Sequence, residues 1–124
     1  MKDSPQGSRG KVAPRGGLLG SWRIVEMDLW DLEDIDVMGP AFIEFTADGM
    51  GRFRFIAVEG WMDCRHQDID GREYVDFTWE GVDEGDEVSG RGWATQEPDG
   101  SLRGHLTFHL GDDSGFRAVR ALKG

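Results

Sequence analysis

The side chains that could do chemistry lie two residues apart, the spacing that places them on one face of a β-strand. Cys64 and His66 share such a face and could contact a metal ion, but two further ligands would be needed and none is evident. Glu26 lies on the same face of the first predicted strand as Trp22, the face that also carries large aromatic residues on the other strands. A carboxylate there could anchor an amine or act as a general acid, although pairing with Arg91 or Arg117 is the more usual outcome. We therefore expect Cys64 and His66 to fill the core, and Glu26 to be a candidate polar anchor.

The remaining chemical motifs are incomplete. The segment Asp68-Ile69-Asp70-Gly71 begins like a calcium loop, but Arg72 and the missing distal glutamate break the pattern, so we predict a hairpin turn there. The sequence contains no glycine-rich phosphate loop, nucleophile elbow or thiol redox pair. It therefore predicts no catalytic residue, no metal site and no cofactor. A barrel enzyme that uses Glu26 or His66 for acid–base work is the least favoured function.

Composition and charge indicate one acidic globular domain. The 124 residues carry a net charge of −10, and their length allows a sizeable core. We predict a flexible basic tail over residues 1–17 and a single domain over residues 18–124. An acidic domain repels phosphate backbones, so nucleic acid is not an expected partner. No run approaches the roughly 20 apolar residues of a membrane span, no secretory signal is evident and Cys64 is the only cysteine, so we expect a cytoplasmic protein without membrane contact.

Alternating polar and apolar residues recur in short segments that are separated by turn signals such as Asp-Gly. The clearest segment sets Val75, Phe77 and Trp79 against Tyr74 and Asp76. Eight strands are predicted, over residues 18–28, 41–46, 51–58, 61–68, 72–80, 87–96, 101–110 and 116–121. Between them we predict, among others, a turn at Glu59-Gly60 and an acidic loop over Val82 to Asp86.

The predicted fold is all-β. Short connections without crossover helices indicate an antiparallel up-and-down meander with a short flap between the first and second strands. Large aromatic residues fall on one parity of successive strands: Trp22, Phe45, Phe53, Phe55, Phe77, Trp79, Phe108 and Phe116. This single apolar face favours an eight-stranded closed barrel over an open sandwich. Such a barrel can be filled by side chains or hold one small ligand.

The first and last strands carry a known pattern. Gly20-Ser21-Trp22 resembles the G-x-W motif on the first strand of the calycin superfamily, the lipocalin-like barrels, and Arg120 stands near the end of the last strand. The resemblance implies that Arg120 packs across Trp22 at the closed end of the barrel, where Gly20, Trp22 and Arg120 would be structural residues. It also implies binding of a small ligand. The chain lacks the signal peptide, disulfides and final helix of secreted lipocalins, and is more similar to small uncharacterised bacterial barrels.

Strand direction places half of the 24 acidic residues near the open end, with no lysine or arginine in the loops there. They are Asp28, Asp31, Glu33, Asp34, Asp36, Glu59, Asp83, Glu84, Asp86, Glu87, Asp112 and Asp113. A rim of one sign favours a cationic ligand or a basic partner surface. The same charges could also serve only to keep the protein soluble.

Two main functions follow from this arrangement. The first is a non-catalytic binding module for a small apolar or amphipathic ligand, which could be cationic, at the acidic mouth, held by Glu26, Trp30, Trp61 and Trp79. The second is a structural or interaction protein with a filled barrel that meets a basic protein partner or another copy. A homodimer would use a strand face, because acidic rims repel each other. The apolar residues of the flap are expected to fold back and seal the mouth, with a moving lid as the alternative.

Overall fold

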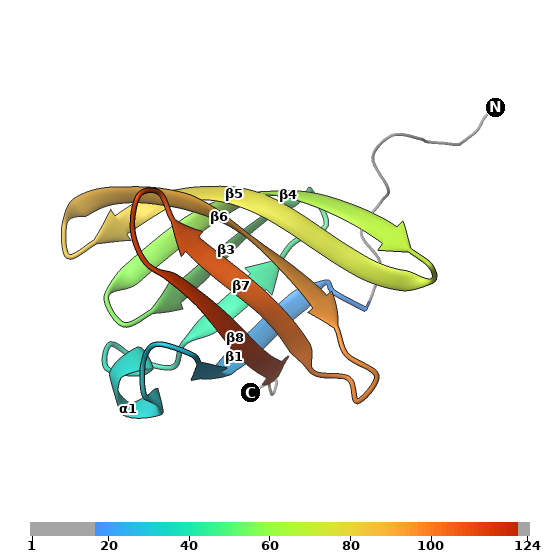
Figure 1. Cartoon of the computed structure of the whole chain (residues 1–124), viewed down its shortest axis with the longest axis horizontal. Coiled ribbons are helices and arrows are strands. Elements are labelled where there is room, and N and C mark those ends of the chain that lie inside the picture. The colour runs from blue at the N-terminus through green and yellow to red at the C-terminus, as the bar shows by residue number, and fades with distance from the viewer. Residues whose placement is uncertain (1–16, 122–124) are drawn as a thin grey trace.

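The computed structural model describes residues 17–121, which form one closed antiparallel barrel (Figure 1). The strands follow in chain order around it, and β1 pairs with β8 to close it. The elements are β1 (Gly20–Met27), α1 (Leu32–Ile35), β2 (Phe42–Phe45), β3 (Met50–Phe55), β4 (Val58–Ile69), β5 (Arg72–Asp83), β6 (Asp86–Gln96), β7 (Leu102–Phe108) and β8 (Asp113–Arg120). The predicted eight-stranded meander is confirmed. Of the predicted tail over residues 1–17, only Gly17 lies within the described residues.

Tight hairpins join the long central strands. Asp70 and Gly71 connect β4 to β5, and both have positive φ, as a two-residue hairpin turn of this kind requires. Glu84 and Gly85 do the same between β5 and β6. The predicted acidic loop over Val82 to Asp86 was therefore wrong: β5 and β6 continue through most of it.

The turn between β3 and β4 also differs from the prediction. The chain reverses at Ile56 and Ala57, and Gly60 lies inside β4, opposite Phe53. Ile56 adopts φ of 55°, a conformation that β-branched residues rarely take. Its N–H donates to the carbonyl of Ile35, 2.9 Å away, so a contact from the flap accompanies this turn.

The predicted aromatic face is the core. Seven of its eight members are buried, and the eighth, Phe108, is partly buried and packs against them. Glycines lie opposite several of the rings on neighbouring strands: Gly60 faces Phe53, and Gly104 faces Phe116. A Cβ at Gly60 would lie 2.6 Å from Cε2 of Phe53. Small residues thus make room for large ones across the sheet, which lets side chains fill a narrow barrel.

The closed end has the expected tryptophan–arginine pair. The Arg120 guanidinium carbon lies 4.0 Å from the centroid of the Trp22 ring, and Trp22 is fully buried. Arg120 also donates to the carbonyls of Leu19 (2.6 Å) and Gly17 (2.9 Å). Gly20 has φ of 107°, so the chain turns into β1 in a conformation that favours glycine.

A β-bulge corrects the predicted orientation of Glu26. Ile24 pairs with Ala118 and Glu26 with Arg117, so two steps along β1 match one step along β8 and Val25 is the extra residue. Beyond the bulge the inward position passes to Met27, which is buried, while Glu26 is exposed on the outer face. The alternation that predicted an inward Glu26 did not include this extra residue.

Candidate functional site

The four residues predicted to hold a ligand do not meet at one site. Trp79 is buried in the barrel, and Glu26 lies outside it. Trp61 is 51% exposed on the outer face of β4. Trp30 lies in the flap with its ring centroid 5.5 Å from that of Phe55. A single pocket built from these four side chains is therefore not what the fold provides.

Aromatic rings fill the barrel towards the flap. Phe53 contacts both Phe55 and Trp79, with ring centroids 5.9 and 5.0 Å apart. Phe108 completes the set at 5.2 Å from Trp79 and 6.2 Å from Phe55. Among residues 17–121, Nε1 of Trp79 is a buried donor without a hydrogen-bond partner. Ring-to-ring contacts thus occupy the barrel interior at this end.

The flap, residues 29–40, is fastened over this end of the barrel. Ile35 of α1 is fully buried and joins the core. The Asp36 carboxylate forms an ion pair with Arg23 (2.6 Å) and accepts a hydrogen bond from the N–H of Ala41 (2.9 Å). Arg54 donates a hydrogen bond to the carbonyl of Pro40 (3.3 Å). These contacts join the flap to β1, β2 and β3. The expectation that apolar residues of the flap fold back on the barrel is confirmed for Ile35.

The other apolar side chains of the flap face solvent. Leu29 is 50%, Leu32 48%, Val37 63% and Met38 63% exposed. The prediction that the flap's apolar residues fold back on the barrel was therefore wrong for these four. In α1, Ile35 occupies the side that reaches the core, so Leu32 is left on another side of the helix. The flap thus presents an apolar surface to solvent instead of a covered one.

Carboxylates surround that surface. At the end of the barrel where the flap lies, the β3–β4, β5–β6 and β7–β8 turns also meet, at the left in Figure 1. Three acidic residues there have structural partners: Asp28 accepts from the N–H of Gly115 (3.1 Å), Asp36 pairs with Arg23, and Asp113 pairs with His105. Within the described chain the others have no ion pair or side-chain hydrogen bond: Asp31, Glu33, Asp34, Glu59, Asp83, Glu84, Asp86, Glu87 and Asp112.

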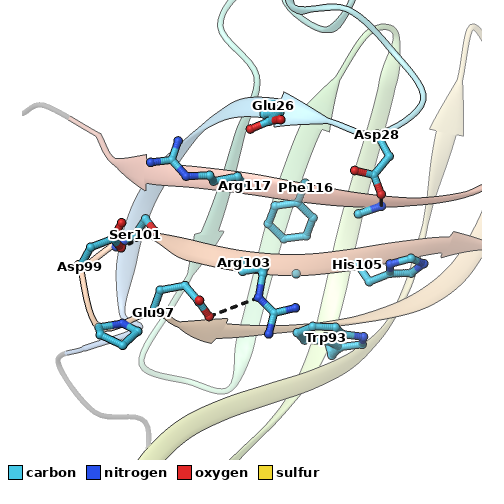
Figure 2. A pocket seen from close by; sticks show the side chains of 13 residues that line it. Glu26, Asp28, Trp93, Glu97, Asp99, Ser101, Arg103, His105, Phe116 and Arg117 are labelled. Atoms are coloured by element: carbon cyan, nitrogen blue, oxygen red, sulfur yellow. Dashed lines mark hydrogen bonds and ion pairs between the residues drawn. The ribbon is translucent and has the colours of Figure 1, made fainter.

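Glu26 lies in a shallow groove of about 610 Å³ on the outside of the barrel, which we call the Glu26 groove. Figure 2 shows it across β1, β8, β7 and β6, with Glu26 at one side and Trp93 at the other. The Arg103 guanidinium carbon lies 5.2 Å from the Trp93 ring centroid, and Arg103 donates to Glu97 at 3.2 Å. Arg117 stands opposite Glu26 in the sheet register.

Sequence reasoning missed this groove because its members come from four strands. Trp93 was not assigned to the outer face, because the alternation of polar and apolar residues around it, from Arg91 to the buried Ala94, is weak. Only the register brings Trp93 level with His105 and Gly115. The absence of a side chain at Gly115 then leaves space in the groove, which the carboxylate of Asp28 enters from one side.

The remaining candidate groups have structural surroundings. Cys64 and His66 are buried, as predicted, and His66 packs edge-on to Phe45 with ring centroids 6.1 Å apart. The described residues contain no group of three or more histidine, cysteine or acidic side chains that could hold a metal ion. The hydroxyl of Thr46 lowers the pKa of Asp48, and the hydroxyl of Ser101 lowers that of Asp99; both carboxylates lie in turns at the closed end.

Comparisons add no relative to this description. In the part of the chain that the structure describes, no helix is long and apolar enough to cross a membrane. The chain matches no protein-family model, no curated protein and no solved structure.

Proposed function

We propose that this chain is a non-catalytic binding module that takes a basic protein partner at the flap end of a filled, lipocalin-like barrel. The lipocalin-like assignment is supported by the stacking of Arg120 on Trp22 and by the positive φ of Gly20. The choice of a protein partner over an enclosed ligand is supported by one observation. Aromatic side chains occupy the barrel, while apolar side chains of the flap lie in solvent among carboxylates that have no ion pair within residues 17–121.

The exposed flap surface has the composition of a recognition surface. Leu32, Val37 and Met38 are held on a short segment whose backbone is fixed by hydrogen bonds to Asp31, Leu32 and Asp36. A fixed surface loses little conformational entropy on binding. An amphipathic segment with lysine or arginine on its polar side fits this surface, because its apolar side would cover the leucine, valine and methionine. Its charges would meet the surrounding carboxylates.

Binding to a defined probe tests the proposal. The probe is a synthetic 18-residue amphipathic helix of lysine and leucine, titrated by calorimetry at 50 and 300 mM salt, with a glutamate–leucine peptide of equal length as the comparison. We expect only the lysine peptide to bind, and more weakly at high salt. Leu32→Ser with Val37→Ser, and separately Asp31→Asn with Glu33→Gln and Asp34→Asn, should each weaken binding about tenfold.

A matched control lies at the opposite end of the barrel. Ile69 is 45% exposed in the β4–β5 hairpin beside Asp70. The double variant Ile69→Ser with Asp70→Asn removes one apolar and one acidic group far from the flap, and it should bind like the wild type. Equal binding of both peptides, or equal weakening by the control, would reject the flap as the binding surface.

A second candidate function is binding of a small cationic or amphipathic molecule in the Glu26 groove. It is favoured by the presence of an exposed carboxylate, Glu26, and a half-buried aromatic ring, Trp93, at the two sides of one groove. Native mass spectrometry of the protein purified from its own host tests this alternative. A retained molecule that disappears in a Glu26→Gln and Trp93→Ala variant would favour it over the flap proposal.

A further inference from the structure

A second groove lies on the outer face of the barrel, where β4, β5, β6 and β7 run side by side. It measures about 450 Å³, and we call it the Arg91 groove. Arg91 and Trp93 of β6 line it, with Thr78 of β5 and Thr107 of β7. Ligand sites in proteins commonly measure about 300–1,000 Å³, so this groove has room for a molecule with one or two rings.

Arg91 lies between two threonines in the groove. In the sheet register it is opposite Thr78 on one side and Thr107 on the other. Directly opposite residues lie about 5 Å apart and point to the same face, so the three side chains form one polar row across the sheet. Within residues 17–121, none of the three side chains has a hydrogen bond or an ion pair. A guanidinium with five N–H donors and two hydroxyl groups is therefore available in one place.

The other charged groups of the groove already have partners. Arg65 forms an ion pair with Asp63 (2.9 Å), and Asp76 accepts a hydrogen bond from the amide of Gln67 (3.1 Å). Asp63 lies two strands away from Arg91. The groove thus holds two carboxylates and two arginines, and the charged group left without a partner among the described residues is a cation. An anion at Arg91 would gain a charge-assisted hydrogen bond without breaking an existing pair.

Aromatic side chains lie beside this polar row. Trp93 follows Arg91 by two residues on β6, so both point outward and lie about 7 Å apart along the strand. Trp93 is half-buried and lies opposite His105 of β7, which also lines the groove. An indole in this position offers apolar area against which another ring can pack. The groove therefore combines a cation and an aromatic surface at a separation that one small molecule can span.

We propose that the Arg91 groove binds a small aromatic carboxylic acid. Its carboxylate would accept hydrogen bonds from the Arg91 guanidinium and from the hydroxyl of Thr78 or Thr107, and its ring would pack against Trp93. A cation would instead meet Arg91 at the centre of the groove, so this site differs in charge preference from the Glu26 groove and from the flap surface. The inference is independent of the partner proposed for the flap.

Titration of the full chain with 2-naphthoate tests the proposal, with uncharged 2-naphthamide as the matched probe, because the two differ mainly in charge. Amide shifts of the labelled protein, followed by nuclear magnetic resonance, give both the affinity and the place of binding. We expect 2-naphthoate to bind with a dissociation constant on the order of 1 mM or below and to shift the amides of Arg91 and Thr107. Binding of 2-naphthamide should be at least about tenfold weaker.

Two variants assign the contacts. Arg91→Gln and Trp93→Ala should each raise the dissociation constant of 2-naphthoate about tenfold, since one removes the cation and the other the ring. Arg117→Gln is the matched control: Arg117 is also an exposed arginine without an ion pair in the described chain, but it lies outside the Arg91 groove. This control should bind 2-naphthoate like the wild type.

Three results would overturn the inference. They are equal binding of the acid and the amide, no binding of 2-naphthoate at 5 mM, and an Arg91→Gln variant that is folded by circular dichroism and binds like the wild type. Binding of the lysine peptide at the flap should be unchanged in Arg91→Gln, so failure of one proposal leaves the other testable.

Discussion

The ring of Phe53 takes the space that a side chain at Gly60 would need. The two residues face each other across β3 and β4, and a Cβ at Gly60 would lie 2.6 Å from Cε2 of a ring that is itself buried. A buried ring in contact with Phe55 and Trp79 has little freedom to move aside.

Gly60→Ala should therefore destabilise the barrel by about 1–3 kcal/mol in urea unfolding, because one added methyl group overpacks the core. Phe53→Leu frees space at the same point. In a double-mutant cycle the two changes should cost less together than the sum of their separate costs. Additive costs would contradict the direct steric contact.

Arg120→Met should lower the free energy of unfolding by about 1–3 kcal/mol. The change keeps an apolar chain over Trp22 but removes the cation over the ring and the hydrogen bonds to the carbonyls of Leu19 and Gly17. Thermal unfolding followed by tryptophan fluorescence measures the loss. Arg117→Met on the same strand is the control and should stay within about 0.5 kcal/mol of the wild type.

Asp36→Ala should loosen the flap before it unfolds the barrel. The carboxylate joins Arg23 and the N–H of Ala41, so its loss should cost about 1–2 kcal/mol. Hydrogen exchange should speed up over residues 34–41 and stay unchanged in β5 and β6. Asp34→Ala, an exposed neighbour without a side-chain partner in residues 17–121, should leave exchange in the flap near the wild-type rate.

Stability should fall as the pH drops below about 4. Hydroxyls of Thr46 and Ser101 donate to Asp48 (2.5 Å) and Asp99 (2.6 Å), and these contacts lower the pKa of both carboxyls in the folded chain. The unfolded chain then takes up protons first as the pH falls, so the stabilisation is present above its pKa and is lost towards the lower, folded pKa.

The variant Asp48→Asn with Asp99→Asn should show a shallower fall of stability across that acidic range. Urea unfolding between pH 2.5 and 6 measures the slope for each protein. A slope equal to that of the wild type would mean that these two turns contribute nothing to the acid dependence.

The fold could be predicted from the sequence because its strongest signals are local. Alternation fixed which residues of β5 face inward, and Asp70-Gly71 marked its hairpin. The turn at Ile56 escaped prediction because an isoleucine with positive φ is rare and Glu59-Gly60 offered a more ordinary turn nearby. Gly60 serves packing against Phe53 instead.

The candidate surfaces could be predicted only in part. The gathering of acidic residues at the flap end could be predicted from the direction of the strands alone. The Glu26 groove depends on which residues lie side by side across four strands, and the bulge in β1 shifts that alignment by one residue. The exposure of Leu32 and Val37 was missed because an apolar residue in a loop looks the same whether it contacts the core or a partner.

Val25 has a consequence for how this barrel type is detected. The extra residue shifts the register of β1 by one position. Trp22 and Ile24 lie before the shift and pair with the C-terminal half of β8, whereas Met27 lies after it and pairs with Phe116. A search pattern that demands strict alternation still reads β1 as one strand, but it places Glu26 on the inner face and Met27 on the outer face, the reverse of their positions. Relatives of this chain would be recognised more readily by a pattern that permits one added residue between Ile24 and Glu26.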